Sequence, residues 1–173
     1  TYKVVEYKSK YYKVQLWDIA GQDRNVSLTK VFAKNATGCI ILSDVTNAES
    51  LEATSKWKEE IEKNTVFPDG GEMPCLLIQN KVDLVENESE NEEEIKKFAE
   101  EKKYINVFNT SAKTGYNVNE AMTYMINHIV DRLEEYRQKT GITIGEDRKS
   151  IVLETNKPKK ISLFQTTSCP CKF

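Results

Sequence analysis

One polar motif of this chain, Trp17-Asp-Ile-Ala-Gly-Gln22, follows an apolar segment and carries residue types that suit phosphate hydrolysis. Asp18 is an acid at the end of a predicted strand, Gly21 allows a close approach to its backbone amide, and Gln22 can orient a water molecule. A second interpretation stays open, in which Asp18 caps a strand-terminal turn and Gly21 supplies a positive φ angle.

A second motif, Asn80-Lys-Val-Asp83, has the chemistry of a purine site. The Asp83 carboxylate can accept two neighbouring N–H groups, which matches guanine, whereas adenine offers no such pair. The stem of Lys81 can lie along a purine face, and Asn80 can hydrogen-bond the base or tie neighbouring loops together. The same four residues are also ordinary turn composition.

A third motif, Ser111-Ala112-Lys113, offers backbone amides that can donate to a purine carbonyl oxygen. On its own, this tripeptide is equally compatible with a purine-binding loop and with the start of an ordinary loop. Its position directly after a predicted strand relates it to the other two motifs.

Apolar segments alternate along the chain and predict the elements that position these motifs. Tyr2–Tyr7 and Tyr11–Trp17 predict an antiparallel hairpin. Further strands are expected at Gly38–Ser43, Cys75–Gln79 and Ile105–Phe108. Helices are expected to begin at the capping patterns Thr46-x-x-Glu49 and Asn117-x-x-Glu120.

This order predicts an α/β fold, with a mostly parallel sheet and helices on both of its faces. Asp18, Asn80 and Ser111 each follow a predicted strand. Because ligands of such sheets bind at the carboxyl ends of the strands, we expect the three motifs to meet at one edge.

Composition narrows the possible classes of protein. The 173 residues suffice for one core, and the formal charge of −2 gives no indication of a nucleic acid or acidic partner. Cys39 and Cys75 lie in apolar segments and are expected to be reduced core residues, whereas Cys169 and Cys171 lie near the end of the sequence. This distribution favours an intracellular protein over a disulfide framework.

Together, and in this order, the motifs resemble those of the Ras superfamily of small GTPases, specifically its Rab branch. Residues 17–24 resemble the family's WDxAGQER element, residues 80–83 its NKxD and residues 111–113 its SAK. Ile19, Trp57-Lys58 and the Phe67–Pro74 insertion resemble the subgroup associated with lysosome-related organelles. The resemblance covers Tyr2 to Arg137 and implies a P-loop NTPase-like fold, the Ras-like G domain.

The resemblance also implies roles for single residues. Asp18 would reach Mg²⁺ through a water, Gly21 would donate its amide to the γ-phosphate of GTP, and Gln22 would orient the attacking water. The residues that would hold the guanine base of GTP or GDP are Asn80, Lys81, Asp83, Ser111, Ala112 and Lys113.

By the same resemblance, the protein would be a GTP-hydrolysing switch in vesicle trafficking. It would act on the cytoplasmic face of endosomal or lysosome-related membranes and cycle with the cytosol. The segment Gln22–Asn35 would contact effectors, an exchange factor and a GTPase-activating protein. Prenylation machinery and a GDP-dissociation inhibitor would be further partners, and no nucleic acid is expected.

Departures from the family pattern fall in two places. Asp23, Asn25 and Val31-Phe32 replace the usual switch residues, which bears on the identity of the effector more than on nucleotide binding. No G-x-x-x-x-G-K-[ST] phosphate loop occurs in the sequence. We therefore expect a fragment that lacks the first strand, phosphate loop, first helix and first switch, and that is inactive in isolation.

Two regions are expected: a partial G domain at 1–139 and a flexible tail at 140–173. Cys169 and Cys171 in the tail resemble doubly geranylgeranylated cysteines, and two lipid chains anchor a protein stably. Unmodified thiols or a pair of metal ligands are the alternatives. Two other functions remain open, a nucleotide-free interaction module that contacts Rab partners and a purine-nucleotide domain with different chemistry.

Overall fold

The structure, a computed structural model, describes residues 1–19, 35–85 and 92–142, together with the backbone of 159–167. The strands are β1 (Tyr2–Tyr7), β2 (Lys10–Ile19), β3 (Gly38–Asp44), β4 (Cys75–Asn80), β5 (Asn106–Asn109) and β6 (Lys159–Thr167). The helices are α2 (Ala48–Asn64), the short 3-10 helix η2 (Val82–Leu84), α3 (Glu92–Glu101) and α4 (Val118–Thr140). In this part of the chain, none of the helices combines the length and apolar character that crossing a membrane requires.

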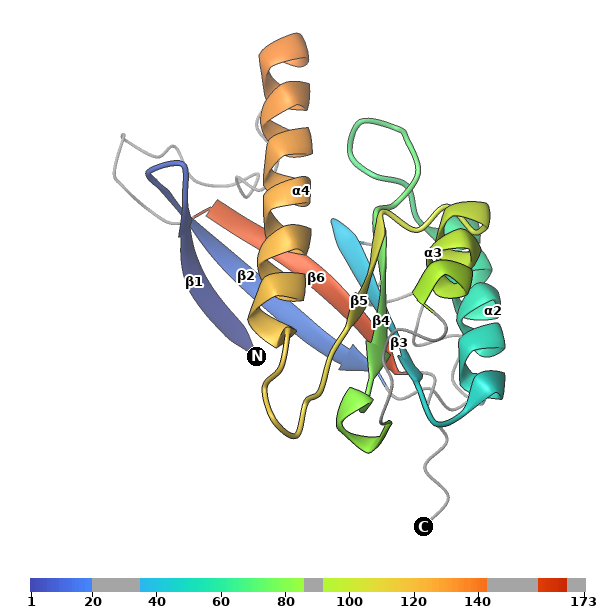
Figure 1. Cartoon of the computed structure of the whole chain (residues 1–173). Helices are drawn as coiled ribbons and strands as arrows, with labels where there is room; N and C mark the ends of the chain where they lie inside the picture. The colour runs from blue at the N-terminus through green and yellow to red at the C-terminus, as the bar shows by residue number, and fades with distance from the viewer. Residues whose placement is uncertain (20–34, 86–91, 143–158, 168–173) are drawn as a thin grey trace.

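The strands form one sheet in the order β1-β2-β6-β3-β4-β5. β1 runs antiparallel to β2, and every other neighbouring pair is parallel (Figure 1). Lys8 and Ser9 both have positive φ angles, 50° and 58°, which is the geometry of a two-residue hairpin turn. The predicted α/β fold, with a mostly parallel sheet and one antiparallel hairpin, is confirmed.

Helices cover both faces of the central strands. In β3, Ile40 packs in a cluster with α4, whereas Cys39 and Ile41 pack in the opposite cluster with α2 and α3. Strands that are buried on both faces need apolar residues at every position, which explains the uninterrupted apolar segments. Cys39 and Cys75 are each 1% exposed and carry free thiols, as expected of core cysteines.

The two predicted helix starts differ from the structure in detail. The N-cap of α2 is Asn47, one residue after the predicted Thr46, and its side chain accepts from the Ser50 amide at 3.3 Å. Thr46 instead donates its hydroxyl to the Asp44 carboxylate at 2.7 Å. Asn117 does precede α4, but it makes no side-chain cap and donates to the Asn109 carbonyl oxygen at 3.1 Å.

The strand β6 was not predicted, because residues 140–173 were expected to form a flexible tail. Lys159–Thr167 instead form a strand that pairs with β2 on one side and with β3 on the other. Its sequence has no clear strand period, so its structure depends on the two neighbours that supply backbone partners. The proposed boundary at 139 stays a prediction.

An arginine on α4 holds the loop between α2 and β4. Arg132 donates to both carboxylate oxygens of Asp69 at 2.7 Å and to the Glu72 carbonyl oxygen at 2.8 Å. Its guanidinium also lies 4.0 Å from the centroid of the Phe67 ring, a side chain that is 1% exposed. The loop is therefore tied to the helix by a bidentate ion pair and a cation–π contact.

Arg132→Ala should lower the free energy of unfolding by about 1–3 kcal/mol, because it removes the charge-assisted hydrogen bonds and the ring contact together. Arg137→Ala is the matched control, since the Arg137 side chain is 41% exposed and forms an ion pair along the helix with Glu134. The control should change stability by less than about 0.5 kcal/mol. Urea denaturation of both variants measures the difference, and equal losses would contradict the assigned role of Arg132.

Candidate functional site

The parallel strands bring polar residues to one edge of the sheet. β3 ends at Asp44 and β4 at Asn80, and these two residues are register partners. Gln79 is likewise the partner of Asn109 at the end of β5, two residues before Ser111. The second and third sequence motifs therefore lie side by side, as predicted from their position after strands.

Asn80 joins the loops that follow β4 and β5. Its side-chain oxygen accepts from the Ala112 amide at 2.9 Å and from the Thr110 hydroxyl at 3.4 Å. Its carbonyl oxygen accepts from the Val45 amide at 3.0 Å, at the end of β3. Of the two roles considered for Asn80, this geometry favours the joining of neighbouring loops.

Two residues of the third motif, Ser111 and Lys113, contact the carboxylate of Asp83. The Ser111 hydroxyl donates to one carboxylate oxygen at 2.6 Å, and the Lys113 ammonium lies 3.7 Å from the other. The hydrogen bond from Ser111 is the largest cause that lowers the pKa of Asp83 below its ordinary value; desolvation opposes it, and a backbone hydrogen bond and the charge of Lys113 add to it. Asp83 is therefore ionised at neutral pH, and a carboxylate with about four lone-pair sites keeps capacity for two more N–H donors.

Ser111, which donates the hydrogen bond to Asp83, is itself buried, with 1% of its surface exposed. Its oxygen donates to Asp83 and accepts from the Thr114 amide at 3.1 Å. The loop then closes through the Gly115 amide, which donates to the Ser111 carbonyl oxygen at 2.8 Å. Gly115 has a φ of 83°, which explains why a glycine occupies that position.

Lys81 has a left-handed backbone and an ion pair that the sequence did not predict. Its ammonium lies 2.6 Å from the carboxylate of Asp44, a residue that is 7% exposed. Burial raises the pKa of Asp44, but hydrogen bonds from Lys81 and Thr46 outweigh it and lower the pKa to about 2. The sequence contained one indication of this ion pair. Asp44 comes at the end of one apolar segment, as Asn80 does at the end of another, so the residues beside them could be expected to lie close together.

Asp18 lies near the carboxyl end of β2 but apart from the other two motifs. It pairs with Gln165 of β6, which in turn pairs with Ile40 of β3. Asp18 is therefore level with a residue four positions before Asp44, a difference of about 13 Å along the strands. This separation suits the two ends of an extended ligand better than one compact site.

The remaining predicted site residues are Gly21, Gln22, Cys169 and Cys171, and all four lie outside the described residues. Within the described ranges, no group of three or more His, Cys, Asp or Glu side chains could hold a metal ion. Mg²⁺ bound through phosphates takes only one or two carboxylates, so the water-mediated role of Asp18 stays a prediction.

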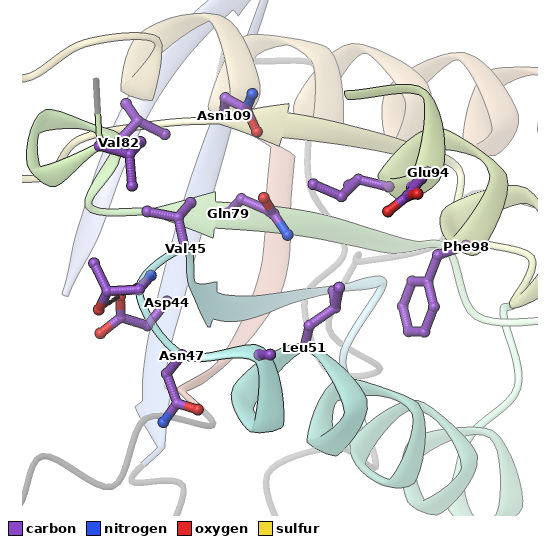
Figure 2. Close-up of a pocket in the computed structure, with 13 residues that line it drawn as sticks. Asp44, Val45, Asn47, Leu51, Gln79, Val82, Glu94, Phe98 and Asn109 are labelled. Carbon is purple, nitrogen blue, oxygen red and sulfur yellow. Dashed lines mark hydrogen bonds between the residues drawn. The ribbon is translucent and has the colours of Figure 1, made fainter. Parts of the chain in front are cut away.

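A pocket of about 530 Å³ lies next to this edge, between the start of α2, β4 and α3. Figure 2 shows Gln79 between Val45 and Glu94, with Phe98 at the far end. Asn80, Asp83 and Ser111 do not line this pocket. The described part of its wall passes from Val85 to Glu94, and residues 86–91 lie outside the description, so we assign it no ligand.

Comparison with known proteins gives a consistent set of relatives. The Ras family model matches residues 1–131. Rat Ras-related protein Rab-7L1 is 34% identical over 134 residues, which is 77% of this chain and 65% of the relative. Human Rab-7L1 is 36% identical and human Rab-32 is 33% identical, each over 118 residues and 68% of this chain. The chain covers 58% and 52% of those two relatives, so it spans between half and two thirds of these proteins.

Lys81→Ala should destabilise the chain at pH 7 by about 1–3 kcal/mol, because it leaves a buried carboxylate without its main partner. The pKa of Asp44 is held at about 2 in the folded state, so its contribution exists above the ordinary value of 3.8 and is lost as the pH falls toward 2. The cost of Lys81→Ala should therefore shrink between pH 5 and pH 2.

Denaturation at several pH values, with Lys56→Ala as an exposed lysine control, measures this dependence. NMR titration of the Asp44 carboxyl group should show its pKa rising in the variant. A loss of stability that is the same at pH 2 and pH 7 would exclude the ion pair as its cause.

Proposed function

Because this chain belongs to the Ras family and to its Rab branch, we propose that it is part of a guanine-nucleotide-dependent switch that binds and hydrolyses GTP. The single observation that supports this most strongly is the network of Asn80, Asp83, Ser111 and Ala112. It orients an ionised carboxylate at the surface, and a carboxylate is the acceptor that the two neighbouring N–H groups of guanine require.

In the proposed complex, Asp83 accepts the N1–H and the exocyclic amine of guanine. The Ala112 amide already donates to Asn80 and the Ser111 amide to the Tyr116 carbonyl oxygen, so the Lys113 amide would face the base carbonyl. The stem of Lys81 would lie along the ring. The ion pair of Lys81 with Asp44 would hold that stem in place. Adenine offers no pair of N–H groups to Asp83, which is the proposed source of the selectivity.

The phosphate end of the nucleotide is assigned to the first motif. Asp18 would hold Mg²⁺ through a water, Gly21 would donate its amide to the γ-phosphate, and Gln22 would orient the attacking water. Hydrolysis would depend on positioning and on charge stabilisation. Loss of the γ-phosphate would then release the segment 22–35 and change its affinity for partners.

Partners and location follow from family membership as proposals. Effectors, an exchange factor and a GTPase-activating protein would contact residues 22–35, and a GDP-dissociation inhibitor would carry the protein through the cytosol. We propose a G-domain part at 1–139 and a tail at 140–173 that is lipidated at Cys169 and Cys171. The target would be the cytoplasmic face of endosomal or lysosome-related membranes.

Asp83→Asn tests the base assignment in the complete protein. The amide cannot accept two N–H groups, so affinity for GDP should fall at least about 100-fold, while xanthine nucleotides regain affinity. Fluorescent nucleotide titration measures both. Asp131→Asn is the control, because Asp131 pairs with Tyr7 and Lys8 away from the site. Unchanged GDP affinity would remove Asp83 from its assigned role.

Gln22→Leu tests the hydrolytic assignment in the complete protein. GTP should still bind, because no base contact is lost, but single-turnover hydrolysis should slow by about 10-fold or more. Gln138→Leu, on the exposed side of α4, is the matched control. Hydrolysis at the unaltered rate would show that another group orients the water.

A further inference from the structure

A polar cavity of about 220 Å³ lies between α2, the end of α3 and the loop that precedes β4. Glu72 and Lys103, which both line it, each come three residues before a strand, because β4 starts at Cys75 and β5 at Asn106. Figure 1 shows α2 and α3 side by side, and both helices contribute walls of the cavity. The cavity is therefore at the amino ends of these strands, at the opposite edge of the sheet from the proposed base site.

Lys58 of α2 lines this cavity although it is only 4% exposed. Its ammonium forms an ion pair with Glu62, one turn later on the helix, and lies 5.7 Å from the centroid of the Tyr104 ring. An ammonium has three N–H donors, and a buried one is stable only when acceptors surround it. Glu62 is its one hydrogen-bond acceptor in the part of the chain that the structure describes, so two donors of Lys58 can serve a group in the cavity.

Ser55 places a second polar group on the same wall. It lies three residues before Lys58 and four before Glu59, a spacing that puts all three on one face of α2, and all three line the cavity. The Ser55 hydroxyl oxygen is buried and has no hydrogen-bond partner among the described residues. A buried hydroxyl without a partner is unfavourable, so a ligand atom that accepts from Ser55 would relieve that cost.

The charges around the cavity restrict the class of ligand. Four carboxylates and three ammonium groups line it, so an anion would meet a surplus of negative charge, whereas a cation would meet the ammonium of Lys58. A neutral group that both accepts and donates avoids both conflicts. The Glu59 carboxylate, 3.9 Å from the Lys63 ammonium, keeps capacity to accept from such a group. A primary carboxamide, with one carbonyl acceptor and two N–H donors, has the required combination.

We propose that this cavity binds a primary carboxamide, with Lys58 and Ser55 donating to its carbonyl oxygen and Glu59 accepting from its nitrogen. The volume of about 220 Å³ suits one such group with a short aliphatic stem. It lies below the range of about 300–1,000 Å³ that is typical of pockets for drug-sized ligands. The carboxamide can belong to a small molecule or to an asparagine or glutamine side chain of a partner protein.

The test is a titration of the full chain with propionamide, followed through the backbone amide signals of α2 by NMR. Propionate and propylammonium are the charged probes of similar shape. Propionamide should shift the signals of residues 55–62 to saturation and should bind at least tenfold more tightly than either charged probe. Tighter binding of a charged probe, or no saturating shift with any of the three, would overturn the proposal.

Two variants test the assigned donors. Lys58→Met keeps a long side chain without N–H donors and should weaken propionamide binding at least tenfold, and Ser55→Ala should weaken it at least threefold. Alanine is the best helix former, so Ser55→Ala keeps the test decisive if Lys58→Met, which leaves Glu62 without its partner, does not fold. Lys56→Ala is the matched control, because Lys56 is exposed and does not line the cavity. Unaltered binding in Ser55→Ala would contradict the assignment.

Two capped tripeptides distinguish the sources of the carboxamide. One has glutamine between two glycines, the other has glutamate at the same place, and both end in an N-methylamide so that the glutamine supplies the primary carboxamide. Binding of the glutamine peptide at least as tight as that of propionamide would assign the site to a partner protein, and binding of propionamide alone would assign it to a small molecule. These titrations contain no nucleotide, so their outcome is independent of the proposed GTPase function.

Discussion

The candidate site depends on the hydrogen bonds that join the loop after β4 to the loop after β5. Ser111 donates to Asp83 at 2.6 Å, and the Ala112 amide donates to Asn80 at 2.9 Å. Two loops whose bonded residues are 28 and 32 positions apart in the chain thereby become one surface. Without these bonds, the parallel strands would bring the loops to the same edge but would not orient the Asp83 carboxylate.

The ion pair between Lys81 and Asp44 also stabilises this edge of the sheet. Asp44 is buried and ionised, and this combination is favourable only because Lys81 and Thr46 supply charge-assisted hydrogen bonds. Lys81, the other member of the pair, is the N-cap of η2, has a left-handed backbone and lies two residues before Asp83. The residues of the proposed base site therefore also contribute to the stability of the fold.

The centre of the sheet is organised differently. There, β6 joins β2 to β3 through its backbone, while α4 holds the hairpin from one face. The position of Asp18 relative to Asp44 follows from this arrangement, because β6 sets the spacing and register between their strands. A segment outside the family match thus influences the geometry of the whole edge.

The sequence by itself determined the α/β class, the hairpin, the buried strands and the family, which the comparisons confirmed. It did so because strands covered on both faces must be apolar throughout, and because three polar motifs follow strands in a fixed order. Only the tertiary structure decided the Lys81–Asp44 pair, the loop-joining role of Asn80 and the strand β6. Each of these depends on a partner distant in the chain, and no local pattern of residues specifies that partner.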